Sequence, residues 1–500
     1  MTFVGLLALA PLAAFLLVLL LPQSQSRIAA LIFSVVIFVG SLGLLIAPAE
    51  TDLPWIPAVD IHFHLGADGL SIWLVLLSTF LTPLAVLLSW KHIDQRIKAY
   101  YALLLLLEFG LVGVFLALDL FLFFVFWEVS LVPMYFLIGI WGHERRIYAA
   151  VKFFLYTMAG SALMLVAILY IYTRTQTFDY PTILKLMDSG AFELTEPQQM
   201  GLFLAFFLAF AIKVPLFPFH TWLPDAHVEA PTAGSVMLAA VMLKMGTYGL
   251  MRFCLPMFPS AARRSAGWIV TLAIIGIIYG ALVALVQPNM KKLVAYSSVS
   301  HLGFVVLGIF SFTAAGLDGA VFQMLAHGIS TGALFALVGM LYERRHSLEI
   351  ADYGGVATPA PWLATAFLIT SFASAGLPLL SNFVGEFLVL RGAAEVNFKW
   401  SVYAAIGVIL SACYLLWLCQ RVFYGEASGD LRSLMHDLSA REWSVVIPLV
   451  VLMVWLGIGA QTFLPRISEA NGLILKETTL NVPFRVAAPA LEPREIASAR

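Results

Sequence analysis

Apolar residues fall in blocks of about 20, and polar residues gather between the blocks. A helix of that length crosses the hydrocarbon core of a bilayer. The pattern predicts an all-α polytopic membrane protein with about fourteen transmembrane helices, near residues 2–21, 27–47, 68–89, 100–118, 119–141, 147–173, 199–222, 230–254, 266–286, 291–312, 317–342, 360–391, 400–424 and 442–464. The first block lacks a basic start and a cleavage site, so we expect a span rather than a signal peptide.

Two of these blocks are interrupted by proline. Residues 211–218 read AIKVPLFP, and residues 376–386 read GLPLLSNFVGE. Proline frees backbone carbonyls, which survive at membrane depth only where protein or internal water receives them. Interrupted helices at corresponding places in two halves are typical of inverted-repeat transporters.

The spacing of buried charges supports such a repeat. Lys213 and Glu386 are 173 residues apart, and so are Glu128 and His301. Each pair lies five spans apart, an odd number, so the second copy would be inverted. We predict three N-terminal helices in 1–99, two inverted five-helix repeats in 100–255 and 266–424, and a loop, last helix and tail in 425–500.

Basic residues predict the orientation of the chain. The odd-numbered connections hold 13 Lys and Arg residues and the even-numbered ones hold 7. Because cytoplasmic loops carry the excess of basic residues, we expect the odd connections in the cytoplasm and both termini on the opposite face.

Composition agrees with a membrane protein and excludes several other classes. The chain is 61% hydrophobic and only 11% charged, too few charges for the surface of a soluble protein of 500 residues. The net charge of −1 gives no indication of nucleic-acid binding. The three cysteines have no CxxC spacing, so we expect inert thiols rather than a zinc or Fe–S site.

Several ionisable residues nevertheless lie inside the predicted spans. Each costs about 2.5–3.5 kcal/mol to insert, so intramembrane charges indicate function. The set comprises Glu108, Glu128, Lys213, Lys244, His301, His327 and Glu386.

These residue types suit a proton path. Burial favours the neutral amine of lysine and a nearby carboxylate favours the ammonium, so Glu128 and Lys213 could take up and release a proton. Lys244 would be a central carrier, His301 and His327 relays, and Glu386 an end station. The alternatives are structural ion pairs, hydrogen-bonded core histidines or haem ligands.

A polar segment follows the seventh span. His220, Asp225 and His227 could indicate a metal site, but their spacing fits a polar mouth or turn better. Asp119, between two spans, is expected to cap a helix. Nucleotide-binding loops and the common hydrolase motifs are absent.

Long motifs extend this interpretation to a known family. Residues 217–236 (FPFHTWLPDAHVEAPTAGSV), 243–249 (LKMGTYG), 126–128 (FWE), 292–301 (KLVAYSSVSH) and 382–387 (NFVGEF) resemble signatures of the antiporter-like subunits of NADH:quinone oxidoreductase, respiratory complex I. The resemblance covers roughly residues 90–425.

The resemblance implies a fourteen-helix fold and proton translocation driven by redox chemistry elsewhere. It assigns Glu128 and Lys213 to a first pair, Lys244 to the centre, His301 and His327 to the relay, and Glu386 to the end. No cofactor is expected in this chain; FMN, Fe–S clusters and quinone would be held by other subunits. One departure is Leu379, where the family pattern has a small residue.

Partners implied by the resemblance are other complex I membrane subunits, especially neighbouring antiporter-like ones, and the lipid bilayer. We expect the bacterial inner membrane rather than an organellar one. The rival functions are a subunit of a multisubunit cation/proton antiporter, a subunit of a membrane-bound hydrogenase, or a structural scaffold of a redox complex.

Overall fold

The computed structural model describes residues 2–426 and 429–480, and this part of the chain is almost entirely helical. A hairpin of β1 (Glu50–Ile56) and β2 (Ile61–Gly66) is its two-stranded sheet. The first helices are α1 (Phe3–Leu20), α2 (Ser26–Ser41), α3 (Ser71–Leu88), α4 (Ile97–Leu116), α5 (Leu120–Trp141), α6 (Arg146–Thr175), α7 (Tyr180–Asp188), α8 (Glu196–Lys213), α9 (Trp222–Glu229), α10 (Thr232–Met237), α11 (Leu243–Gly249) and α12 (Leu255–Met257). The later helices are α13 (Pro259–Leu285), α14 (Met290–Ile309), α15 (Ala314–Arg345), α16 (Pro361–Ser374), α17 (Ser381–Val396), α18 (Phe398–Phe423), α19 (Gly429–Leu434), α20 (Ala440–Ile458) and α21 (Leu464–Leu480).

Twelve membrane-spanning candidates occur in the described part of the chain, judged by length and apolar character. The predicted seventh and twelfth spans are not among them. The 18 residues of α8 begin with a polar run at 196–199, and the twelfth span is divided between the shorter helices α16 and α17. A turn separates α8 from α9, and another separates α16 from α17. The interruptions lie where proline predicted them, and the total of fourteen spans stays a prediction.

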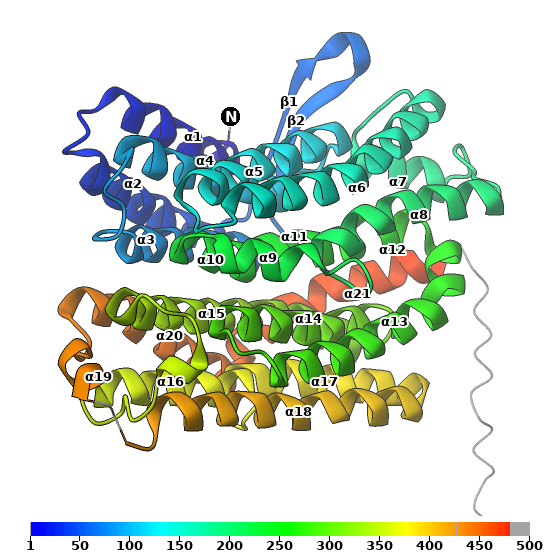
Figure 1. The fold of residues 1–500 in the computed structure, drawn as a ribbon. Coiled ribbons are helices and arrows are strands. Elements are labelled where there is room, and N and C mark those ends of the chain that lie inside the picture. The colour runs from blue at the N-terminus through cyan, green and yellow to red at the C-terminus, as the bar shows by residue number, and fades with distance from the viewer. Residues whose placement is uncertain (1, 427–428, 481–500) are drawn as a thin grey trace, which may run out of the picture.

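Two layers of helices make up the molecule. Figure 1 shows α1–α12 in one layer and α13–α20 in the other, with α21 between them and the hairpin projecting from the first layer. The spans formed by α10–α12 and by α15 are buried along their apolar windows, whereas α1, α2, α18 and α20 leave most of theirs exposed. The first two are therefore central, and the others lie at the periphery of the chain.

Connections of the same parity meet on the same face. His143 N donates to Glu229 O at 3.0 Å, which joins the fifth and seventh connections. Leu118 N donates to His64 O at 2.9 Å, which joins the fourth connection to the hairpin in the second. This arrangement is expected when successive spans cross the membrane in opposite directions. The assignment of one face to the cytoplasm stays a prediction.

Matching turns support the predicted repeat, but at another offset. Asp119 caps α5 by accepting from Leu122 N at 2.8 Å, as predicted, and Asn289 caps α14 in the same way. The backbones of Asp119 and Asp179 form an isolated β-bridge, and so do those of Asn289 and Glu349. Asn289 lies 170 residues after Asp119, and Glu349 lies 170 residues after Asp179.

The two interruptions match at a third spacing. In the first interruption Leu216 N donates to Ala211 O, and in the second Leu377 N donates to Phe372 O. The donor and the acceptor of the second bond each lie 161 residues after those of the first. Lys213 is the last residue of α8 before its interruption, whereas Glu386 lies in α17 after the second interruption. The shared value of 173 is thus not the spacing of equivalent backbone positions.

Leu379 lies in the second interruption with φ at +75°, a left-handed conformation that favours glycine. A side chain there costs about 1–2 kcal/mol. Leu379 therefore differs from the small residue of the family pattern in two ways, because its side chain is larger and because that side chain disfavours the left-handed backbone conformation. Residues 427–428 and 481–500, within the predicted loop and tail, lie outside the described residues.

Candidate functional site

Lys244 lies in a helix with irregular winding. Two π-helical turns, Leu238–Met242 and Leu250–Cys254, flank the short α11 that carries it. A π turn displaces carbonyls from the regular helical ladder and is frequent at functional sites. The fully buried Lys244 Nζ donates to Ala239 O, in the first of these turns, at 2.6 Å.

His327, on the central helix α15, is the second hydrogen-bond partner of Lys244. Lys244 Nζ lies 2.7 Å from His327 Nδ1, and both side chains are fully buried. Glycine permits this approach, because a Cβ on Gly328 would lie 2.9 Å from Ala240 O. Small residues at helix contacts commonly let backbones pack closely in membranes.

A second buried pair joins α14 to α17. His301 Nδ1 lies 2.9 Å from Glu386 Oε1, and Gln323 Nε2 donates to the same oxygen at 3.0 Å. Tyr414 OH lies 3.2 Å from His301 Nε2. A carboxylate only accepts, so ionised Glu386 selects the tautomer in which His301 Nδ1 donates and Nε2 accepts from Tyr414.

Close packing of α15 against α17 holds Glu386 in this position. A Cβ on Gly385 would lie 2.8 Å from Gln323 Cα, and one on Gly319 would lie 2.6 Å from Val389 N. The glycines therefore bring Glu386 to the Gln323 side chain and to His301 beyond it.

The two pairs form one line through the centre of the protein. The ring centroids of His301 and His327 are 5.6 Å apart. The order is therefore Lys244, His327, His301, Glu386, and four of the seven predicted residues lie together.

Glu128 and Lys213 are neighbours without a hydrogen bond between them. Glu128 directly follows Trp127, whose ring lies against the Lys213 ammonium. Lys213 Nζ lies 5.2 Å from the Trp127 ring centroid and 5.5 Å from that of Phe153, within cation–π range. Within the described residues, neither Lys213 Nζ nor Glu128 Oε1, both buried, has a hydrogen-bond partner.

Glu108 is separate from both groups. It lies in α4, and both of its carboxylate oxygens are buried without a hydrogen-bond partner in the described part of the chain. Among the hydrogen bonds of the described residues, none links it to the rest of the predicted set.

Sequence reasoning missed two neutral members of the site, Gln323 and Tyr414. Gln323 could have been found, because a glutamine within a long apolar helix needs a partner. Tyr414 gave no such signal, because tyrosine is enriched at the interfacial ends of membrane helices and the ends of its span were uncertain.

The polar segment after α8 is a turn followed by α9. Asp225 forms an ion pair with Lys152 at 2.7 Å, and His227 stacks on Phe335. Among the described residues, no three His, Cys, Asp or Glu side chains are grouped to hold a metal ion.

Comparison with known proteins agrees with this geometry. The model of the family described as NADH:quinone oxidoreductase/Mrp antiporter, TM, matches residues 117–412, and that of NADH-ubiquinone oxidoreductase chain 4, amino terminus, matches residues 6–114. NADH-quinone oxidoreductase subunit M of Rhodobacter capsulatus is 49% identical over 444 residues, covering 86% of each chain.

Solved structures show the same fold. A chain of respiratory complex I from Thermus thermophilus matches with a TM-score of 0.88 and 34% identity, covering 95% of this chain and 99% of that one. A chain of the Mrp complex from Dietzia sp. matches with a TM-score of 0.80 and 23% identity, covering 94% of this chain and 51% of that one, and shares the fold. The chain belongs to the NADH:quinone oxidoreductase/Mrp antiporter family of membrane proteins.

Proposed function

We propose that this chain is the proton-translocating subunit M of an NADH:quinone oxidoreductase in a bacterial inner membrane. It would move protons while other subunits transfer electrons from NADH to quinone. The line from Lys244 to Glu386 is the observation that carries the proposal, because it joins ionisable groups through the buried centre of the protein. Similarity to a named subunit M over most of both chains supports the assignment.

A proton would move along the line by exchange at the ring nitrogens. Protonated Lys244 only donates, so neutral His327 accepts at Nδ1 and carries its own proton on Nε2. His327 Nε2 is buried and has no hydrogen-bond partner among the described residues. It is therefore free to pass its proton toward His301 after a ring rotation or through one water. His301 Nδ1 then delivers a proton to Glu386.

Glu128 would control the charge of Lys213. A carboxylate beside a buried lysine favours the ammonium, and its withdrawal or neutralisation favours proton release. Because no hydrogen bond joins the two side chains, a small movement of Glu128 could change the charge of Lys213. Glu108 would serve as a separate station in α4.

The chain is proposed to act only as part of the complete enzyme. FMN, Fe–S clusters and quinone would be held by other subunits, and the partners of this chain would be neighbouring antiporter-like subunits. Purification in mild detergent tests this point. Flavin and Fe–S subunits should copurify, whereas sodium efflux by a complex without them would favour a cation/proton antiporter.

Substitution of the first pair tests the proton path. We expect Lys213→Ala and Glu128→Ala to leave the complex assembled but nearly unable to pump protons into vesicles when NADH is supplied. Lys185→Ala and Glu193→Ala, at exposed positions outside the line, are the matched controls. Wild-type pumping by both path variants would refute these assignments and favour a structural scaffold.

A further inference from the structure

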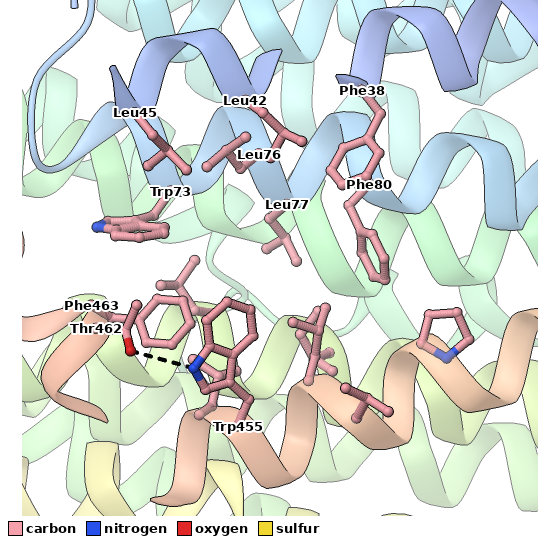
Figure 2. Close-up of a pocket in the computed structure, with 16 residues that line it drawn as sticks. Phe38, Leu42, Leu45, Trp73, Leu76, Leu77, Phe80, Trp455, Thr462 and Phe463 are labelled. Carbon is pink, nitrogen blue, oxygen red and sulfur yellow. Dashed lines mark hydrogen bonds between the residues drawn. The ribbon is translucent and has the colours of Figure 1, made fainter. Parts of the chain in front are cut away.

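An apolar cleft of about 350 Å³ separates α2 and α3 from α15 and α20. Its lining is almost entirely hydrocarbon, from leucine, isoleucine, valine, phenylalanine, proline and tryptophan side chains, with Thr462 at one end. Figure 2 shows Phe38 and Phe80 toward the other end. The proton path described above uses none of these residues.

The cleft lies at the depth of acyl chains. Its walls belong to helices long and apolar enough to span a membrane, and the same helices carry exposed apolar residues outside the lining, such as Val36 and Val39 on α2 and Ile447 on α20. Along α20 the lining runs from Pro448 to Leu456, about 12 Å at the helical rise. Half of the hydrocarbon core is about 15 Å thick, so the cleft extends through most of one leaflet.

Aromatic and polar groups gather at one end of the cleft. Figure 2 shows Trp73, Trp455 and Thr462 there, with the Trp455 indole donating to Thr462 Oγ1 at 3.3 Å. Trp73 is only 8% exposed, and its Nε1 has no hydrogen-bond partner in the described part of the chain. Tryptophan is enriched where the hydrocarbon region meets the headgroups.

A polar cavity of about 430 Å³ adjoins this end. Ile72 lines the polar cavity and the next residue, Trp73, lines the cleft. Arg466 and Glu469 also line the polar cavity, and Arg466 Nη2 donates to the carbonyl of Leu45, a cleft residue, at 2.6 Å. Asp68, which is paired with Arg252, and Glu477 line the same cavity, so two guanidinium groups and three carboxylates stand beside the interfacial end of the apolar cleft.

We propose that the cleft and the polar cavity together bind one phosphatidylethanolamine-type phospholipid. One acyl chain occupies the cleft, the phosphate lies at Arg466, and the ammonium lies at Glu469. Guanidinium groups bind phosphate with several N–H donors, and the carboxylate matches the amine.

Photolabelling of the intact purified complex in nanodiscs tests the acyl-chain site. The probe is phosphatidylethanolamine with a diazirine at mid-chain, and labelled peptides are mapped by mass spectrometry. Label should concentrate on α3 and on the part of α20 that lines the cleft. Val451→Trp fills the cleft from an exposed position and should lower this label by about tenfold, a loss of about 1.4 kcal/mol in binding.

Ile447→Trp is the matched control, because Ile447 is similarly exposed one turn earlier and does not line the cleft. Equal labelling of the wild type and Val451→Trp would mean that only bulk lipid contacts this face, and would overturn the proposal. A photoreactive residue at position 451 that crosslinks to a neighbouring subunit would overturn it as well.

The headgroup is tested separately. Arg466→Gln should lower labelling by the phosphatidylethanolamine probe by about tenfold, as expected for loss of a charged hydrogen bond, and should leave labelling by a diacylglycerol probe unchanged. Glu469→Gln should remove the preference for phosphatidylethanolamine over phosphatidylglycerol. Equal retention of both phospholipid probes by wild type and both variants would refute the headgroup assignment.

Discussion

Replacing Glu386 by glutamine separates its charge from its shape. Glu386 Oε1 receives hydrogen bonds from His301 at 2.9 Å and from Gln323 at 3.0 Å, and an amide oxygen can accept both. Oε2 is buried without a hydrogen-bond partner among the described residues, and the amide nitrogen of glutamine would take its place. Glu386→Gln therefore preserves the contacts of the side chain but removes its ability to exchange a proton.

The energetic effects of Glu386→Gln nearly cancel. Two charge-assisted hydrogen bonds become neutral ones, a loss of about 2–3 kcal/mol in total. Removing a charge from the membrane interior regains about 2.5–3.5 kcal/mol. The new buried NH₂ group without a partner costs about 1–3 kcal/mol. We expect a net destabilisation of about 1–2 kcal/mol, which leaves the complex assembled.

NADH-driven proton uptake into proteoliposomes, normalised to bound flavin, measures the effect. We expect pumping to fall by about tenfold or more, a barrier increase of at least 1.4 kcal/mol. Glu395→Gln, on the same helix in an exposed ion pair with Arg391, is the control and should pump normally. Wild-type pumping by Glu386→Gln at equal flavin content would show that Glu386 is not a proton station. Failure to assemble would refute the energetic balance.

Three further predictions concern the rest of the structure. His64 lies 2.5 Å from Asp179 and also contacts Glu50, and against the lowering effect of burial these carboxylates raise the pKa of His64 to about 9. The protection factors of the hairpin amides, which are corrected for the intrinsic base-catalysed exchange rate, should therefore fall as pH rises from 6.5 through 9, and constant protection factors would contradict this. Arg344→Ala breaks a buried bidentate pair with Glu442, at a cost of about 3–5 kcal/mol that should reduce the amount of complex in membranes; wild-type amounts would contradict this. Leu379→Gly should raise the thermal stability of the complex by about 1 kcal/mol, and an unchanged melting temperature would argue against backbone strain there.

The apolar blocks of the sequence determine the helices, because the bilayer requires every spanning segment to satisfy its own backbone. The two interruptions could be predicted for the same reason, since proline removes a donor from the helical ladder. Buried charged residues could be predicted as well, because Lys244 and Glu386 are conspicuous within otherwise apolar segments of the sequence. The lining of the apolar cleft could not be read in this way, since its residues resemble those of any span.

Which of the buried groups meet was decided only by the tertiary structure. Equal sequence spacing related Lys213 to Glu386 and Glu128 to His301 as equivalent positions of a repeat, which does not predict contacts. The hydrogen bonds join Lys244 to His327 and His301 to Glu386. The physical reason is that helix contacts depend on small residues and irregular turns. Glycines let α15 approach its neighbours, and π turns lie on both sides of the short helical segment that carries Lys244. The sequence therefore determined which residues lie within the membrane, and the packing of the helices determined the order in which the ionisable side chains contact one another.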